Sequence, residues 1–450
     1  MNNKKKFIFL LVFLLVSHCS FDKKSGIWSG ENEVKRISEL EKNQNIEDNS
    51  SFVKIYSSED TFNKEIALVK NINITNPKEI LSWPMSNLNY QNDLGNIYLP
   101  GINNTFLKTK IGKNKFSTIK VISSPLIHEG NIIFSDNNGT IFNVSLDGKI
   151  NWKKNIYQKI YKKIYKSLVF SIYQNNLYVA DNIGFVYSMN LENGKITWIK
   201  NHSIPLKSHI KVYEKKIFLV NQDNRIICLS TKDGTKIWDV RTISSFIKLQ
   251  NFLSSAISKE GDLLVINSAG DLLKLKASNG RMFWSFNTLE SPMLHDADFF
   301  KSSNIVISDD NIILSVKSLI FSYDLNTGYN NWKQDVATIG TPIIDGSNIY
   351  IVTDNGFFVI IDKNNGKIIS SKNILKILKK NKRDTSITGF IMGSGKVYST
   401  TANGHMIVAS AATGNVEFFK KIGDPLASSP IINDGKLYIL SKNSRIYGFN

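Results

Sequence analysis

The chain has 450 residues, of which 42% are hydrophobic, and its formal net charge at pH 7 is +18. This length and apolar content are sufficient for a large folded body and exclude a mainly disordered chain. The sequence contains two cysteines, too few for a fold that depends on a framework of disulfides.

The N-terminus has the pattern of an export signal. Lysines at positions 4–6 precede an apolar stretch, residues 7–16, which is too short to span a bilayer and has the length of a signal-peptide core. The stretch ends in Val-Ser-His-Cys, which resembles the lipobox of bacterial lipoproteins. Residues 1–18 are therefore interpreted as a signal peptide and Cys19 as the site of lipid attachment. His18 departs from the small residue usual at that place, and the alternative is an ordinary secretory signal with an unrelated cysteine.

Residues 19–82 show no regular hydrophobic period. Their polar composition predicts a lipid-anchored linker, mostly disordered, and the packed region is expected to begin at Trp83. Ser20 is not an acidic residue of the kind that retains lipoproteins at the inner membrane. We therefore expect the protein to be lipid-anchored at the periplasmic face of the outer membrane. An exported protein is not expected to bind nucleic acid, despite its positive charge.

A five-residue phrase with glycine first and tryptophan last, G-x-x-x-W, recurs through the rest of the chain at intervals of 38 to 48 residues. A period in this range is typical of architectures in which each repeat buries its faces only against its neighbours. Five full copies, and two degenerate copies that end in serine and phenylalanine, begin at Gly148, Gly194, Gly234, Gly280, Gly328, Gly366 and Gly414.

Within one repeat, residues 123–154, short apolar runs alternate with turn residues. The runs at 131–135 and 140–144 are rich in β-branched and aromatic side chains, and Asp-Asn-Asn-Gly separates them. A further turn, Asp147-Gly148, precedes the run that contains Trp152. This pattern predicts four antiparallel strands, which together form one blade of a β-propeller.

The two ends of the repeat region predict how the ring closes. Seven copies carry the glycine phrase, and an eighth begins at Ser428 but stops after its third strand. We expect residues 106–111 to supply the missing strand, because this closes the ring and removes an exposed sheet edge. The predicted fold is all-β: an eight-bladed β-propeller of four-stranded antiparallel blades over residues 83–450, closed by an N-terminal strand. A seven-bladed ring is the alternative.

The recurring tryptophans have two interpretations. They could stack on a cofactor or a sugar, or they could pack between adjacent blades. Packing is the preferred interpretation, because a binding site needs one tryptophan and not one at the same place in five repeats.

Two segments concentrate positive charge. One interleaves lysines with isoleucines and tyrosines at a period of four, residues 153–166, as in a short amphipathic helix that could lie on an anionic membrane. The other contains Lys376, Lys379, Lys380, Lys382 and Arg383. The preferred interpretation of both segments is a solvated loop between blades.

The sequence contains no motif typical of an enzyme active site. There is no H-E-x-x-H, no G-x-S-x-G and no phosphate-binding loop. Asp296 and Asp298 beside His295 make a poor calcium site, because few other oxygen-bearing side chains are near them in the sequence. We therefore predict no metal, no cofactor and no catalytic residues.

The blade phrase resembles the pyrroloquinoline-quinone-like repeat over residues 83–450. Two families share this repeat: the quinoprotein dehydrogenases, and the propeller lipoproteins of the outer-membrane β-barrel assembly machinery. The dehydrogenases are larger and hold their cofactor with an adjacent pair of cysteines, which this chain lacks. The export signal, Cys19 and the linker are similar to the assembly lipoproteins. This resemblance implies a scaffold without enzymatic activity in the outer-membrane protein assembly complex.

The resemblance also implies a partner surface on two loops. In the assembly family one loop carries Leu-x-Leu-Arg, and residues 247–250 occupy a similar place here, with Ile247, Leu249 and, instead of the arginine, Gln250. The next loop carries Leu-x-Asp-x-Asp, which matches residues 294–298 with Asp296 and Asp298. These residues are expected to bind the periplasmic POTRA domains of the barrel-forming subunit. Direct pairing of blade edges with unfolded outer-membrane protein clients is a further implication of the resemblance.

Two other functions remain open at this point. One is a quinoprotein-like oxidoreductase, and the other is a periplasmic module that binds a glycan or peptide through the loops at one end of the propeller.

Overall fold

The computed structural model of this protein divides into two units, residues 1–60 and 61–450. In the first unit only two strands are described, as backbone. β1 (Cys19–Phe21) pairs antiparallel with β2 (Trp28–Gly30), so that Cys19 is opposite Gly30. In the second unit the structure describes residues 62–113, 123–161, 163–243, 252–289, 300–379, 384–426 and 428–450.

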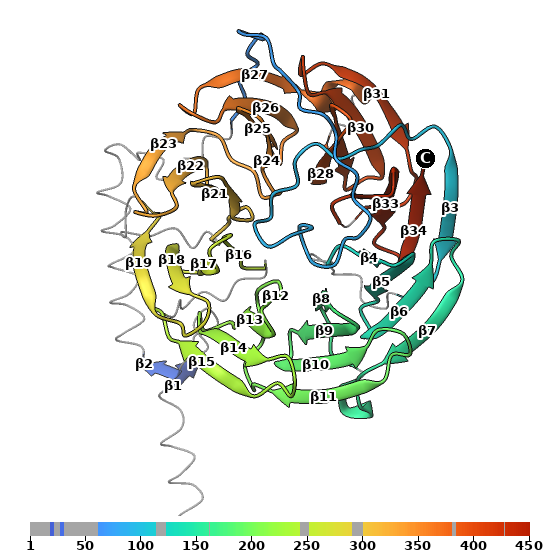
Figure 1. Ribbon diagram of the computed structural model, residues 1–450, viewed down its shortest axis with the longest axis vertical. Helices are drawn as coiled ribbons and strands as arrows, with labels where there is room; N and C mark the ends of the chain where they lie inside the picture. Colours follow the sequence, from blue (N-terminus) through green and yellow to red (C-terminus); the bar gives the residue numbers. More distant parts are fainter. Residues whose placement is uncertain are drawn as a thin grey trace, which may run out of the picture. The chain divides into compact units, whose positions relative to one another are not determined.

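The described part of the second unit forms eight four-stranded antiparallel sheets arranged in a ring (Figure 1). In blades 1 to 7 the four strands are consecutive and run from the centre of the ring outward. The strands of blades 1 to 4 are β4 (Leu126–His128), β5 (Asn131–Ser135), β6 (Thr140–Ser145) and β7 (Ile150–Asn155); β8 (Leu168–Tyr173), β9 (Asn176–Asp181), β10 (Phe185–Asn190) and β11 (Ile196–Asn201); β12 (Lys211–Tyr213), β13 (Lys216–Val220), β14 (Ile226–Ser230) and β15 (Lys236–Val240); and β16 (Ser255–Ile257), β17 (Asp262–Ile266), β18 (Asp271–Lys276) and β19 (Met282–Asn287).

The remaining blades follow the same order. The strands of blades 5 to 7 are β20 (Val306–Ser308), β21 (Asn311–Val316), β22 (Leu319–Asp324) and β23 (Asn330–Gln334); β24 (Ile343–Asp345), β25 (Asn348–Val352), β26 (Phe357–Asp362) and β27 (Ile368–Asn373); and β28 (Ile387–Gly393), β29 (Lys396–Thr401), β30 (His405–Ser410) and β31 (Val416–Lys421). Blade 8 consists of β32 (Ile431–Asn433), β33 (Lys436–Leu440), β34 (Arg445–Phe449) and β3 (Thr105–Lys110).

Blade 8 confirms the predicted closure and the count of eight. Strand β3 pairs antiparallel with β34, with Thr105 opposite Phe449 and Lys110 opposite Arg445. The strand therefore comes from the N-terminal side of the propeller and fills the outermost position that the C-terminal copy leaves empty (Figure 1). Backbone pairing of the two ends makes the ring continuous.

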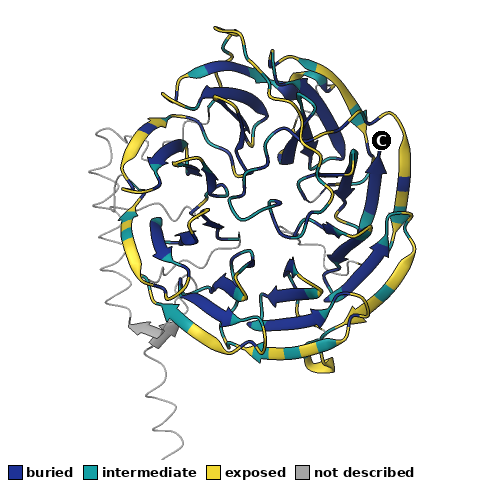
Figure 2. Cartoon of the chain, viewed as in Figure 1, coloured by how far each residue is buried: buried dark blue, intermediate teal, exposed yellow. Residues whose placement is uncertain are grey.

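Burial follows position within the blade. The two middle strands of each blade are buried over most of their length, as in β6 and β10. The outermost strands alternate between partly buried and exposed residues, as in β11, because only one face packs against the neighbouring blade. Figure 2 shows this as buried inner strands surrounded by a partly exposed rim.

The tryptophans pack between blades, which confirms the preferred interpretation. The ring of Trp152 lies against Gly194 in the next blade, and its Nε1 donates a hydrogen bond of 2.9 Å to the Leu191 carbonyl oxygen. Trp198 and Trp238 repeat this contact with Gly234 and Gly280. A Cβ at Gly194 would be 2.8 Å from the Trp152 ring, so the glycine leaves the space that the indole occupies. The two ends of the G-x-x-x-W phrase therefore meet across the blade boundary.

The packed region begins earlier than the sequence indicated. The expected boundary was Trp83, but residues 62–82 already contact the propeller. Ile66 pairs with Ser371 through two backbone hydrogen bonds of 2.9 and 3.0 Å, so the segment lies along the outer edge of β27. Ser370, which replaces tryptophan in this copy, is fully buried next to Ile66. These pairings are single bridges rather than a full strand, and they leave no periodic pattern in the sequence.

Residues 80–99, which we call the plug, cross the centre of the ring (Figure 1). The plug forms backbone hydrogen bonds with the innermost strands of several blades: the Trp83 N–H donates to the Ile127 carbonyl oxygen, and the Pro84 carbonyl oxygen accepts from the Ile172 N–H. In the same way the Tyr90 and Gln91 carbonyl oxygens accept from the N–H groups of Ile257 and Ile307, and the Ile97 N–H donates to the Met392 carbonyl oxygen. The channel of the propeller is therefore closed by the protein's own N-terminal segment.

The amphipathic helix considered for residues 153–166 is not present in the described part of this segment: residues 153–155 belong to β7, and one 3-10 turn, η1 (Lys159–Tyr161), follows. A second 3-10 helix, η2 (Ile374–Ile377), follows β27 and begins with Asn373 as its N-cap. Neither helix in the described residues has the length and apolarity needed to cross a membrane.

The energy of the contact between glycine and tryptophan can be separated from backbone strain by comparing two glycines with similar φ angles. Gly194 and Gly130 have φ angles of +66° and +73°, but a Cβ at Gly130 would meet nothing within 4 Å. Gly130→Ala should cost about 1 kcal/mol from backbone strain alone. Gly194→Ala should cost about 1–3 kcal/mol more, because the methyl group displaces the Trp152 ring. Urea unfolding of both variants measures the difference, and equal losses would contradict an inter-blade role for the tryptophan.

Candidate partner-binding face

The strand order gives the propeller two unlike faces. In each of blades 1 to 7 the chain leaves the outermost strand and crosses to the innermost strand of the next blade on one face, which we call the crossing face. The hairpins between the second and third strands end on this same face. The turns between the first and second strands, and between the third and fourth, end on the opposite face. Long loops therefore occur mainly on the crossing face.

The sequence-predicted partner residues belong to two of these crossings. Ile247, Leu249 and Gln250 come between β15 and β16, and Asp296 and Asp298 come between β19 and β20. All five lie outside the described residues, so their arrangement stays a prediction.

The crossing from β15 to β16 has described residues at both of its ends, and these show where on the propeller it begins and ends. Ile243 follows β15 and is 70% exposed, whereas Phe252 precedes β16 and lies with its ring centroid 4.9 Å from that of His209. The crossing thus starts at the exposed rim and ends at the centre of the ring. Cys19, the predicted lipid-attachment residue, is the first residue of β1, and only its backbone is described.

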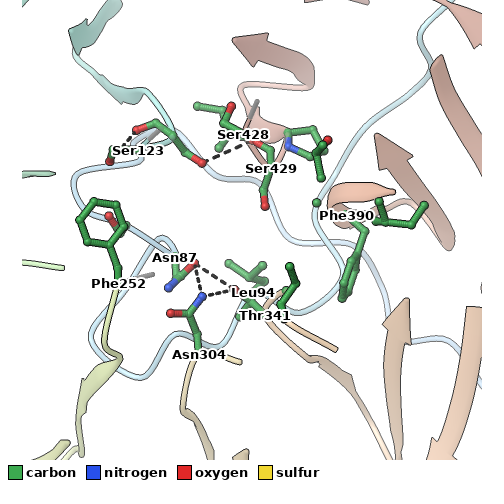
Figure 3. A pocket seen from close by; sticks show the side chains of 18 of the residues that line it. Asn87, Leu94, Ser123, Phe252, Asn304, Thr341, Phe390, Ser428 and Ser429 are labelled. Atoms are coloured by element: carbon green, nitrogen blue, oxygen red, sulfur yellow. Dashed lines mark hydrogen bonds between the residues drawn. The ribbon is translucent and has the colours of Figure 1, made fainter. Parts of the chain in front are cut away.

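The described residues enclose a cavity of about 230 Å³ at the centre of the crossing face. Its wall is formed by residues just before or at the start of the innermost strands, including Ser123, His209, Asn304 and Ser428. Its floor is formed by residues of the plug, including Trp83, Asn87 and Leu94. Figure 3 shows these side chains converging from several blades.

Hydrogen bonds fix the floor of the cavity to its wall. Thr341 Oγ1 donates to Asn87 Oδ1 at 3.0 Å, and Asn304 Nδ2 donates to Thr341 Oγ1 at 2.9 Å (Figure 3). The plug is therefore attached to blades 5 and 6 by side chains as well as by backbone pairing. Sequence reasoning did not identify this cavity, because its lining comes from single residues scattered over more than 300 positions.

Buried titratable groups surround the plug. Lys211, at the start of β12, is 1% exposed, and its Nζ donates to the Ser86 and Asn89 carbonyl oxygens and to Asn92 Oδ1 at 2.6–3.2 Å. These acceptors carry no formal charge, and burial lowers the pKa of Lys211 to about 7. Burial also lowers the pKa of His209 to about 3, and the positive charge of Lys211 contributes.

The side chains present do not fit a quinone with its calcium ion. Cys228, which is buried in β14, and Cys19 are the only cysteines of the chain, so an adjacent pair is impossible. Within the described ranges no three histidine, cysteine or acidic side chains gather as a metal site would require. Part of the space at the centre of the ring is occupied by the plug. We therefore assign no cofactor chemistry to the cavity.

A fold of this kind, a closed propeller built from pyrroloquinoline-quinone-like repeats, is shared by proteins of several functions. Solved structures similar to this chain include BamB of Moraxella catarrhalis, with a TM-score of 0.62 and 11% identity over 76% of this chain and 100% of that one. A europium-containing methanol dehydrogenase is similar with a TM-score of 0.63 and 11% identity over 81% of this chain and 90% of that one. These likenesses show the fold alone.

The sequence comparisons define the family. The family model for outer membrane protein assembly factor BamB matches residues 137–372. Similar relatives include outer membrane protein assembly factor BamB of Moranella endobia, 21% identical over 62% of this chain and 74% of the relative. The protein of that name from Escherichia coli is 20% identical over 61% of this chain and 81% of the relative. The chain belongs to the BamB family.

The lowered pKa of Lys211 predicts that the free energy of unfolding depends on pH. In an unfolded chain the pKa of lysine is about 10.4, so between about pH 7 and 10 the unfolded state binds more protons than the folded state. The free energy of unfolding should therefore rise with pH across this window and stop rising above it. Relative to Lys211→Met, the wild type should gain about 1 kcal/mol per pH unit, measured by urea unfolding at a series of pH values.

Lys195→Met, on an exposed turn of the opposite face, is the control for the loss of one lysine. A difference between wild type and Lys211→Met that stays constant from pH 7 to 10 would contradict the lowered pKa.

Proposed function

We propose that this protein is a non-enzymatic scaffold lipoprotein of the outer-membrane protein assembly complex, located at the periplasmic face of the outer membrane. The observation that carries the proposal is membership of the BamB family, whose name describes an assembly factor. The closed ring and the plugged channel support it, because a rigid body with its centre occupied is suited to binding through its surface. The absence of an adjacent cysteine pair weighs against the quinoprotein alternative.

In this proposal the crossing face is the partner-binding face. The two crossings that contain Ile247, Leu249, Gln250, Asp296 and Asp298 start from neighbouring blades 3 and 4. Apolar side chains from one crossing and carboxylates from the next would contact the POTRA domains of the barrel-forming subunit. Apolar anchors supply most of the affinity of such interfaces, and charges at the rim set orientation and association rate. The scaffold would thereby aid the folding and insertion of β-barrel proteins.

The partner contact is tested by reversing its charges. The triple variant Leu249→Ala, Asp296→Lys and Asp298→Lys should lose at least about 2 kcal/mol of binding free energy toward the barrel-forming subunit, because it removes an apolar anchor and turns attraction into repulsion. Co-purification from the native membrane measures the loss.

The matched control is Glu214→Lys with Glu260→Lys, which reverses two exposed acidic residues on turns of the opposite face. This control should co-purify as the wild type does. Undiminished recovery of the partner with the triple variant would exclude these residues as the contact.

Lipid attachment has a separate test. Cys19→Ala removes the only thiol at the predicted cleavage site, so the variant should lose labelled palmitate and move from the membrane fraction to the soluble fraction of the periplasm. Cys228→Ala, which changes a thiol buried in blade 3, should keep the label. If Cys19→Ala retained the label, the lipid would have to be attached at another residue.

A further inference from the structure

The crossing from β7 to β8, residues 156–167, is a separate feature of the crossing face. It projects from the rim of the ring between blades 1 and 2 (Figure 1), and its residues 158–160, 163 and 164 are exposed, whereas Lys166 at its end is buried. It lies in a stretch without a single acidic residue, since none occurs between Asp147 and Asp181, whereas seven lysines do.

The base of this crossing is rigidly attached to the propeller. The hydroxyl of Tyr157 donates a hydrogen bond of 2.6 Å to Asp181 Oδ2, and its ring packs directly on Gly139, where a Cβ would be 2.2 Å away. Tyr161 packs edge-on against Phe185, with ring centroids 5.8 Å apart. The aromatic side chains of the period-four pattern are thus used for attachment to blades 1 and 2.

At the tip of the crossing, isoleucines and lysines of the period-four pattern are exposed to solvent. Ile160 is 77% exposed and Ile164 is 45% exposed, which is unusual for two large aliphatic side chains so close together. Lys159 and Lys163, next to them in the chain, are exposed as well. Lys153 and Lys154 on the neighbouring outer strand β7 add two more exposed positive charges.

We propose that residues 153–161, 163 and 164 form a membrane-docking surface that binds anionic phospholipid headgroups through its lysines and inserts Ile160 into the interface. A cationic rim around an exposed aliphatic side chain is complementary to a bilayer, which offers negative charge at the surface and an apolar layer below it. An acidic protein would satisfy the lysines but would leave the isoleucines without an apolar environment. The surface is independent of lipid attachment at Cys19, and it would orient the ring relative to the membrane.

The test uses residues 61–450, a unit with its own closed ring and core and without the acylation site, so that a missing lipid anchor cannot affect the result. Binding is measured by flotation with vesicles of phosphatidylcholine, with and without phosphatidylglycerol. The wild type should float with the mixed vesicles and not with pure phosphatidylcholine, and added salt should weaken binding because it screens the lysines.

Three variants identify the surface. Lys159→Gln with Lys163→Gln should lower vesicle binding by roughly tenfold or more, at about fivefold for each lysine near an anionic surface. Ile160→Ser should lower it several-fold without a change of charge. The matched control, Lys195→Gln with Lys232→Gln on exposed turns of the opposite face, should bind within about twofold of the wild type. Thermal unfolding of each variant confirms that it is folded.

Any of four results would overturn the proposal. The first is no flotation of the wild type with mixed vesicles. The second is an equal loss in the control pair, which would show attraction by net charge alone. The third is unchanged binding of Ile160→Ser. The fourth is binding to polyglutamate without binding to vesicles, which would assign the surface to an acidic polypeptide.

Discussion

The backbone pairing of β3 with β34 is the constraint on which the rest of the structure depends. Blades in a ring contact only their neighbours, so an open ring would expose one whole blade face and one sheet edge at each end. Pairing Thr105–Lys110 with Arg445–Phe449 joins the N-terminal side of the propeller to its last blade. Because β3 must reach blade 8, the residues before it are held at the ring, where they pass through the centre as the plug.

The plug changes what the centre of the ring can do. Propellers often bind ligands at the channel, where the innermost strands of all blades converge. Here Asn92 Nδ2 donates to the carbonyl oxygens of Ser255 and Ile305 at 3.0 and 2.7 Å, and Lys211 donates to three acceptors of the plug. Groups that could have recognised a ligand are used to hold the chain's own backbone. This arrangement is consistent with a protein that functions through its outer surfaces.

The two faces of the propeller provide different surfaces. Turns on the opposite face are short, since they connect neighbouring strands within a blade, whereas the crossings must span the radius of the ring. The extra length of the crossings permits specialised surfaces without a change to any blade. The crossing from β7 to β8, with its exposed Ile160 and anchored Tyr157, is one such addition to the scaffold.

The sequence by itself determined the blade, the number of blades, the closing strand and the packing role of the tryptophans. Each of these depends on short apolar runs, turn residues and the glycine phrase, which recur every 38 to 48 residues, and such patterns are local. Only the tertiary structure decided the course of residues 62–99, the central cavity and the single 3-10 turn at Lys159–Tyr161. The reason is physical: contacts such as Pro84 with Ile172 and Asn92 with Ile305 join single residues far apart in the chain, and single contacts of this kind create no period.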